Sequence, residues 1–329
     1  MKAVILNQFG GPEVLEVGEV EKPSPRPGEV LIQVAYAGMN PADWKDREGH
    51  VARFSNPSFP YVMGFDVAGR VVEVGEGVAG FQSGDRVLAC TNHGQGDFGS
   101  YAEYALVSEE KAAALPDTLP FKAGAALPVA ALTAWQALHD RADLKAGQRV
   151  LINGASGGVG SFAVQFARHA GAEVGSLCSA RNLDYVRTLG AEPCFDYEAA
   201  ETPDRLDRWA KGGLDIIVDA VGFGTLPSPW SLLREGGKLV SIATLVGDGD
   251  IEGDMKAAAE KSREKIFAIM MDTSAGEQLS QIAALLEQGA IVLPPIEVFS
   301  LARVAEAHAL LEAGHVRGKL VLEIAGEEM

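Results

Sequence analysis

The sequence predicts an α/β protein with two domains, an irregular β domain and a doubly wound domain built on a parallel six-stranded sheet. Three observations predict this fold class. The chain has 329 residues, 47% of them hydrophobic, which exceeds the usual size of a single core. Short strands and turns fill its first third, and from about residue 122 helices alternate with strands. Between residues 149 and 181, a strand, a glycine-rich turn, a helix and a second strand follow one another.

Residues 1–122 are expected to form the irregular β domain. Their strands are separated by turn residues such as Gly10-Gly11-Pro12. Residues 123–265 are expected to form the doubly wound domain, which a helix over residues 124–141 opens. The strand candidates of the first domain are residues 3–6, 30–34, 67–74 and 86–89, and those of the alternating part are residues 150–152, 172–178, 194–197, 214–220, 238–243 and 266–270.

Strands in such an alternating series run parallel, with right-handed crossovers. Residues 266–329 are expected to return to the first domain. They contain two helical stretches, 277–288 and 301–313, the second with Ser300 as its cap. The last strand, 319–324, has the apolar pattern of β structure that rejoins the first domain.

The glycine-rich turn after residues 150–152 predicts a dinucleotide site. Gly154 lets the chain turn, Gly157 and Gly158 let backbone N–H groups approach a pyrophosphate, and Gly160 lets the helix pack on the strand. A glycine-rich turn in some other α/β protein is the alternative. The strand before it, the helix after it and the second strand all fall where a dinucleotide site needs them, which favours nucleotide binding.

The residues that end the second strand favour NADPH over NADH. An NAD site usually places Asp or Glu about 20 residues after the glycines, where it holds the ribose hydroxyls. This chain has Ser179-Ala180-Arg181 instead. A hydroxyl and a guanidinium suit a 2′-phosphate, and no carboxylate is there to repel it. The alternative is that Arg181 is an ordinary solvated arginine.

Charge and composition exclude several partners. The formal net charge of −17 argues against binding to nucleic acid or an anionic membrane surface. No apolar run approaches the roughly 18 residues of a membrane helix, and the start of the chain has the pattern of a strand, not of a signal peptide. We therefore expect a cytoplasmic protein. The three cysteines form no C-x-x-C pair, and Cys178 and Cys194 are expected to be buried thiols.

Five motifs together resemble the medium-chain dehydrogenase/reductase superfamily, and within it the zinc-independent quinone oxidoreductase and enone reductase branch. The resemblance covers the whole chain. It implies a GroES-like β domain and a Rossmann domain, with the cofactor in the cleft between them. The motifs are GDRV at 84–87, GSYAEY at 99–104, ALTAWQAL at 131–138, INGASGGVG at 152–160 and RGKLVL at 317–322.

The zinc ligands of the related alcohol dehydrogenases have no counterpart here. The resemblance places their cysteine in Gly38-Met39-Asn40 and their histidine in Gly64-Phe65-Asp66. Asn and Phe cannot replace thiolate and imidazole on zinc, and the four-cysteine structural lobe is missing. We expect no metal. His93 is the one histidine placed where it would face the cleft, with a solvated loop position as the alternative.

Without zinc, the expected chemistry is hydride transfer from NADPH to a quinone or to the β-carbon of an α,β-unsaturated carbonyl. Residues 40–45 resemble the N-P-x-D-x-K segment of enone and alkenal reductases. By that resemblance, Asn40 lines the nicotinamide cleft and Lys45 approaches the substrate oxygen. An exposed charged turn at Asp43 and Lys45 is the alternative. The candidates for a substrate pocket are Trp44, Tyr61, Phe65 and His93.

Further cofactor contacts follow from the resemblance. Thr133 is placed on the nicotinamide side, residues 156–159 on the pyrophosphate, and Tyr197 near the 2′-phosphate. Each has a plain alternative, such as an exposed Lys319 or a core Ile242. The complete set of expected cofactor residues is Asn40, Thr133, Ser156, Gly157, Gly158, Val159, Ser179, Arg181, Tyr197, Ile242 and Lys319.

The sequence thus predicts a cytoplasmic, NADPH-dependent, zinc-independent reductase of quinones or enones. Three alternatives stay open: a reductase specific for alkenal or enone double bonds, a non-catalytic NADPH-binding protein, and an alcohol dehydrogenase. The branch commonly forms homodimers, and the apolar strand 266–270 is a candidate to extend a sheet across two subunits. The physiological substrate and the proton donor are not specified by the sequence.

Overall fold

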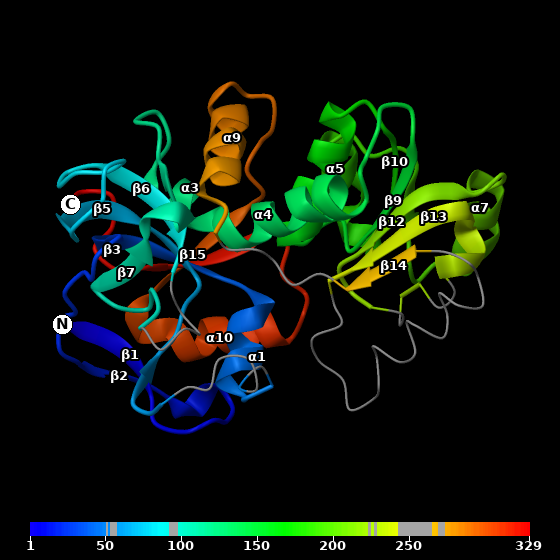
Figure 1. Ribbon diagram of the computed structural model, residues 1–329. Coiled ribbons are helices and arrows are strands. Elements are labelled where there is room, and N and C mark those ends of the chain that lie inside the picture. Colours follow the sequence, from blue (N-terminus) through cyan, green and yellow to red (C-terminus); the bar gives the residue numbers. More distant parts are fainter. Residues whose placement is uncertain are drawn as a thin grey trace. The chain divides into compact units, whose positions relative to one another are not determined.

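The computed structural model describes residues 1–50, 52, 58–91, 98–222, 225–226, 229–242, 265–268 and 274–329. The chain divides into two compact units (Figure 1). Unit 1 comprises Met1–Leu132 and Asp272–Met329, and unit 2 comprises Thr133–Met271.

Unit 1 is built on a seven-stranded sheet whose order is β15-β16-β3-β5-β6-β8, with β7 paired to β3. The central strand β3 is buried along nearly its whole length, which explains why it extends well beyond the predicted residues 30–34. The strands are β3 (Glu29–Met39), β5 (Asp66–Val74), β6 (Arg86–Cys90), β7 (Tyr104–Ser108), β8 (Ala112–Ala114), β15 (Ile296–Ser300) and β16 (Lys319–Glu323).

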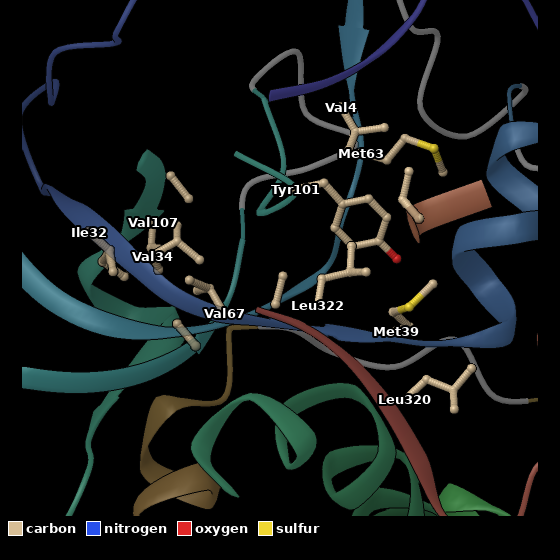
Figure 2. Packing of buried hydrophobic residues seen from close by; sticks show 14 of the residues in the cluster. Val4, Ile32, Val34, Met39, Met63, Val67, Tyr101, Val107, Leu320 and Leu322 are labelled. Carbon is tan, nitrogen blue, oxygen red and sulfur yellow. The ribbon is translucent and has the colours of Figure 1, made fainter. Parts of the chain in front are cut away.

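The last strand returns to the first unit, as predicted. β16 pairs antiparallel with β3, and Leu320 lies opposite Met39. A second, three-stranded sheet has the order β2-β1-β4, with β1 at Lys2–Leu6, β2 at Leu15–Glu19 and β4 at Tyr61–Val62. Apolar side chains from both sheets form the core of the unit, in which Tyr101 lies among Met39, Met63 and Leu322 (Figure 2).

Helices complete unit 1. α3 (Phe121–Ala126) contacts β3 and β5, α9 (Gly276–Glu287) contacts β8, and α1 (Pro41–Arg47) contacts α10 (Val304–Glu312).

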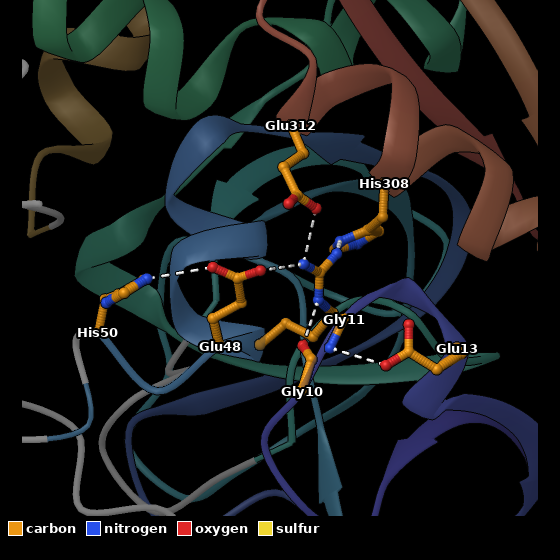
Figure 3. Close-up of polar contacts among 8 residues, drawn as sticks. Gly10, Gly11, Glu13, Glu48, His50, His308 and Glu312 are labelled. Atoms are coloured by element: carbon orange, nitrogen blue, oxygen red, sulfur yellow. Dashed lines mark hydrogen bonds and ion pairs between the residues drawn. The ribbon is translucent and has the colours of Figure 1, made fainter.

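The buried Arg47 joins α1 to α10, and its partners Gly10, Glu48, His308 and Glu312 are labelled in Figure 3. The Arg47 guanidinium is fully buried and donates to Gly10 O at 2.9 Å, to Glu48 at 2.9 Å and to Glu312 at 2.9 Å. Its Nη1 also lies 3.3 Å from Nδ1 of His308. Because arginine can only donate, His308 accepts through Nδ1. This network fixes α1, the helix that begins at the Asn40 segment.

Unit 2 is a parallel six-stranded sheet in the order β11-β10-β9-β12-β13-β14, which confirms the predicted doubly wound architecture. The order reverses between β9 and β12. Ligands of such sheets bind outside the carboxyl ends of the strands at this switch point. The elements are β9 (Arg149–Asn153), α5 (Gly158–His169), β10 (Glu173–Cys178), α6 (Leu183–Thr188), β11 (Cys194–Asp196), α7 (Thr202–Trp209), β12 (Leu214–Asp219), β13 (Leu233–Ser241) and β14 (Lys265–Ala268).

Two helix predictions were wrong in detail. The expected helix 124–141 is broken into α3, α4 (Pro128–Gln136) and a π-helical turn at Ala137–Arg141. Pro128 has no N–H to continue α3, so it starts a new helix instead. Ser300 lies at the N-cap position of the 3-10 turn Leu301–Arg303, and Arg303 lies at the N-cap position of α10; neither makes a side-chain capping bond.

Two predicted strands lie partly beyond the described ranges. β13 ends at Ser241, and residue 243 lies outside; residues 269 and 270 of the strand predicted at 266–270 lie outside as well. Among the described helices, none combines the length and the apolar character that crossing a bilayer requires.

Candidate functional site

The turn after β9 has the backbone that its glycines predict. Gly154 has a φ of +81°, which favours glycine, and a Cβ there would lie 2.6 Å from Cγ2 of Val221. A Cβ on Gly160 would collide with the carbonyl oxygen of Gly154. Both glycines are therefore required by the packing of the turn itself.

Gly157 differs, because the protein leaves space beside it. It precedes α5 in an extended conformation, and among the described residues a Cβ there would meet only Gly154 O, at an ordinary 3.5 Å. The first N–H groups of a helix have no intrahelical acceptor, so the start of the twelve-residue α5 offers donors to an anion. The open side at Gly157 fits a phosphate that approaches the backbone closely.

Asn182 connects this turn to the end of β10, a contact that sequence reasoning missed. Its Nδ2 donates to the hydroxyls of Ser156 and Ser179, at 3.0 Å each. Asn182 directly follows the predicted Arg181 in the sequence. Its side chain reaches the glycine turn because residues Ala180–Asn182 form a 3-10 turn, which was not predicted from the sequence. The structure thus brings Ser156 and Ser179 together. Arg181, which follows Ser179 by two positions, is exposed.

The remaining predicted cofactor residues of unit 2 lie at several places. Tyr197 follows β11 and packs half-buried against a core cluster, and its backbone N–H donates to Cys178 O at 3.2 Å. Ile242 follows β13 and is half-buried, and its N–H donates to Asp219 O at 2.9 Å. Thr133 is buried on α4. Val159 is half-buried in the first turn of α5.

A second polar group missed by sequence reasoning lies at the switch point. Asp219 ends β12, and its Oδ1 accepts from Nδ2 of the buried Asn153 at 2.8 Å and from the N–H groups of Val221 and Gly222. Asn153 ends β9 and also donates to Thr225 at 2.9 Å. These bonds tie the residues before Gly154 to the loop after β12.

In unit 1, Asn40 belongs to a buried polar cluster with Asp66 and Lys319. Asn40 Nδ2 donates to Asp66 Oδ2 at 2.8 Å, and Lys319 Nζ donates to Asn40 Oδ1 at 2.5 Å and to Met39 O at 2.9 Å. Asp66 also accepts from the N–H of Val129 at 2.8 Å. Lys319 is only 3% exposed, so the alternative of an exposed lysine is wrong.

Carboxyl groups in this cluster are held far from water. Burial raises the pKa of Asp66, and Lys319 opposes the rise. Burial raises the pKa of Asp43 well above its usual range, and the nearby Asp66 raises it further. Asp43 Oδ2 accepts from the N–H of Asn40 at 2.6 Å. The alternative of an exposed charged turn at Asp43 is therefore wrong.

Lys45 lies on α1, five residues beyond Asn40, and is half-buried. Burial lowers its pKa. Its Nζ lies 5.7 Å from the centre of the Trp44 ring. A partly desolvated lysine beside an aromatic ring is suited to approach an uncharged substrate.

Two of the substrate-pocket candidates, Trp44 and Tyr61, belong to or pack against the same core cluster of unit 1. Tyr61 is buried in the core and donates its hydroxyl hydrogen to Asp46 at 2.8 Å, Trp44 packs half-buried against that core, and Phe65 is half-buried. His93 lies outside the described residues.

The donor set of the Asn40 cluster does not fit zinc. Phe65 offers no ligand atom, and the amide of Asn40 is engaged on both sides by Asp66 and Lys319. In the part of the chain that the structure describes, no three His, Cys, Asp or Glu residues gather as metal ligands. All three cysteines are free and buried, as predicted for Cys178 and Cys194.

Two family descriptions match the chain: an alcohol dehydrogenase GroES-like domain over residues 26–117 and a zinc-binding dehydrogenase over residues 189–322. A human quinone oxidoreductase is 34% identical over 330 residues, which is 98% of this chain and 97% of the relative. Among solved structures, a quinone oxidoreductase from Coxiella burnetii is 32% identical with a TM-score of 0.87, over 98% of this chain and 99% of the other.

Two further solved structures resemble the chain. An NAD-dependent alcohol dehydrogenase is 30% identical with a TM-score of 0.88, over 99% of this chain and all of the other. A mycobacterial protein solved in complex with NADPH is 28% identical with a TM-score of 0.85, over 98% of this chain and all of the other.

Proposed function

This chain belongs to the quinone oxidoreductase branch of the medium-chain dehydrogenase/reductase superfamily, and from that premise we propose that it is an NADPH-dependent, zinc-independent reductase of quinones or α,β-unsaturated carbonyls. Membership makes it an oxidoreductase with a nicotinamide cofactor. The choice of NADPH, the absence of zinc and the substrate class are the proposal.

The observation that carries the cofactor proposal is the end of β10. Two hydroxyls, of Ser156 and Ser179, converge there on Asn182, and Arg181 follows in a stretch of sequence, Ser179-Ala180-Arg181, that contains no Asp or Glu. A 2′-phosphate needs donors and positive charge, whereas the free ribose hydroxyls of NADH need an acidic acceptor. The mycobacterial relative solved with NADPH supports the same choice.

We assign the pyrophosphate to the open side of the glycine turn and the first turn of α5. Asn40, Thr133, Ile242 and Lys319 are proposed to serve the nicotinamide end, by the family resemblance. When bound, NADPH supplies the hydride, and the protein supplies orientation, exclusion of water and stabilisation of the substrate oxygen that gains negative charge. The residues that would hold the phosphates are Ser156, Gly157, Gly158, Val159, Ser179 and Arg181, with Tyr197 nearby.

Lys45 is proposed to serve the substrate oxygen. Its ammonium would stabilise the negative charge of an enolate or a hydroquinone oxygen and then donate a proton to it. Burial, which lowers the pKa of Lys45, makes the ammonium a better proton donor at neutral pH. Asn40 is held in one orientation by Lys319 and Asp66, and among the described residues its second Nδ2 hydrogen has no acceptor, which leaves it for a ligand in this proposal.

An assay that follows NADPH consumption tests this function. The panel contains benzoquinone, naphthoquinone, short 2-alkenals and cyclic enones, each with and without a chelator. We expect turnover of at least one class, unchanged by the chelator. Activity that is lost on chelation and restored by zinc would contradict the proposal and favour an alcohol dehydrogenase.

The same panel separates the narrower candidates. Activity confined to alkenals and enones would favour the double-bond reductase that residues 40–45 resemble. Cofactor binding without hydride transfer to any compound would favour a non-catalytic NADPH-binding protein. The cytoplasmic location and the homodimer stay predictions; for the latter, β14 lies at the edge of the six-stranded sheet, where a second sheet would join.

A further inference from the structure

The side-chain amide of Asn182 joins the two loops that carry the proposed phosphate contacts. Its Nδ2 lies 3.0 Å from the hydroxyl of Ser156, in the turn after β9, and 3.0 Å from the hydroxyl of Ser179, after β10. Asn182 is 5% exposed, and its backbone N–H donates to Ser179 O at 2.9 Å. The amide is therefore held in place, while both serines remain half-buried.

The direction of these two hydrogen bonds decides what the hydroxyls can still do. A serine hydroxyl has one hydrogen to donate and two lone pairs to accept. Because both hydroxyls accept from Asn182, neither spends its own hydrogen in that contact. Within the described ranges, no other hydrogen bond to either hydroxyl is formed. Each therefore keeps its hydrogen for an acceptor-only ligand, and phosphate oxygens are such acceptors.

We propose that Asn182 is a positioning residue for cofactor selection, which turns the hydroxyls of Ser156 and Ser179 into donors toward the phosphates of NADPH. The inference rests on the proposed function, because that function supplies the ligand. Ser156 serves the pyrophosphate, and Ser179 acts with Arg181 on the 2′-phosphate. Loss of the Asn182 side chain should therefore weaken the binding of NADPH more than the binding of NADH, because NADH has no 2′-phosphate.

A purely structural role makes a different prediction, and Tyr185 provides the control for it. The Tyr185 hydroxyl donates to Ser161 Oγ at 3.0 Å, so it ties the same segment to α5 without involving Ser156 or Ser179. If Asn182 served only as a tether, Tyr185→Phe and Asn182→Ala would have similar effects on cofactor binding.

The test is calorimetric titration of the full-length protein with NADPH, NADH and adenosine 2′,5′-bisphosphate. We expect Asn182→Ala to raise the dissociation constant of NADPH about tenfold and that of NADH about threefold or less. Tyr185→Phe should change either dissociation constant less than about twofold. In a Ser156→Ala/Ser179→Ala background, Asn182→Ala should change NADPH binding less than about twofold, because it acts through those hydroxyls. Circular dichroism melts check that each variant is folded.

Two results would overturn the inference. One is an Asn182→Ala loss that persists in full without the serine hydroxyls, and the other is an equal loss for NADPH and NADH. Failure of the proposed cofactor preference is a separate result that shows in the wild type: NADH bound as tightly as NADPH, and no binding of the bisphosphate. That result overturns both proposals before any variant is compared.

Discussion

The ammonium nitrogen of Lys319 lies 2.5 Å from the amide oxygen of Asn40, although 279 positions separate the two residues. It also lies 3.4 Å from the carboxylate of Asp66, and all three side chains are buried. The pairing of β16 with β3 brings the lysine there. The C-terminal strand thus supplies the positive charge that a buried carboxylate in the middle of unit 1 requires.

Replacing this lysine should cost stability. We expect Lys319→Met to lower the free energy of unfolding by about 3–5 kcal/mol, because Asp66 would remain buried without its counter-charge. Urea unfolding followed by tryptophan fluorescence measures the change. The matched control is the double variant Lys319→Met/Asp66→Asn, in which no buried charge is left alone and most of the loss should be recovered. A single variant as stable as the wild type would show that the pair does not stabilise the fold.

Arg181 should discriminate between the two coenzymes. We expect Arg181→Ala to weaken the binding of NADPH about tenfold or more and to leave the binding of NADH nearly unchanged. Only NADPH carries a 2′-phosphate that the guanidinium can contact. Dissociation constants at two salt concentrations measure this, and the NADPH effect should shrink at high salt. Arg187→Ala is the control, since Arg187 pairs with Asp184 at 2.7 Å on the neighbouring helix α6. An equal effect on both coenzymes would refute the phosphate assignment.

The glycine turn was predictable from sequence because its signal is local. A strand, Gly154, Gly160 and a helix lie within a short stretch, and the backbone confirms the requirement for both glycines. Unit 2 was predictable for the same reason, since alternating strands and helices imply parallel pairing.

The buried cluster was not predictable in this way. Asp66 is 26 positions from Asn40, and Lys319 near the C-terminus has the pattern of a surface lysine until β16 pairs with β3. Strand β2 was missed because most of its residues are exposed, and β8 because three alanines carry no alternation. The cluster thus depends on contacts between segments that are distant in the sequence, whereas the two strands lack a periodic pattern of buried residues.

His308 predicts how stability depends on pH. Burial and, to a smaller extent, the positive charge of Arg47 together lower the pKa of His308 to about 3. In the unfolded chain the pKa of His308 is near about 6.5. Below that pH the unfolded state therefore binds a proton at His308, whereas the folded state does not. Above about pH 6.5 the titration of His308 costs the folded state no stability. Below that pH it lowers the free energy of unfolding by roughly 1.4 kcal/mol per pH unit, down to about pH 3.

The free energy of unfolding, measured at pH 7, 6, 5 and 4, tests whether stability falls on acidification as predicted. His308→Gln should lose less stability on acidification than the wild type, by about 1.4 kcal/mol for each pH unit below 6. The exposed His315→Gln is the control and should follow the wild type. Parallel curves for His308→Gln and the wild type would show that His308 takes up a proton in the folded state as readily as in the unfolded chain.

Lys45 should affect turnover and not folding. We expect Lys45→Met to lower kcat by about 100-fold with little change in Tm, because a general acid typically contributes a factor of about 100 to 10,000. Burial lowers the pKa of Lys45, so the ammonium loses its proton at a lower pH than an ordinary lysine, whose pKa is about 10.4. The wild-type kcat should therefore begin to decline at an alkaline pH lower than about 10.4. Lys45→Arg should keep part of the activity and lack that decline. A Lys45→Met enzyme with wild-type kcat would remove Lys45 from the mechanism.

Gly157 and Gly160 should separate cofactor binding from folding, although they are neighbours in one turn. A Cβ at Gly160 collides with Gly154 O, so Gly160→Ala should lower the free energy of unfolding by about 1–3 kcal/mol. In the part of the chain that the structure describes, a Cβ at Gly157 meets only that same oxygen at 3.5 Å, and the extended backbone there accepts any residue. Gly157→Ala should therefore fold with wild-type stability yet bind NADPH at least about tenfold more weakly, because the methyl group occupies the side that the phosphate approaches. Thermal melts and calorimetric titration of both variants decide the point. A Gly157→Ala protein that binds NADPH normally would place the pyrophosphate elsewhere.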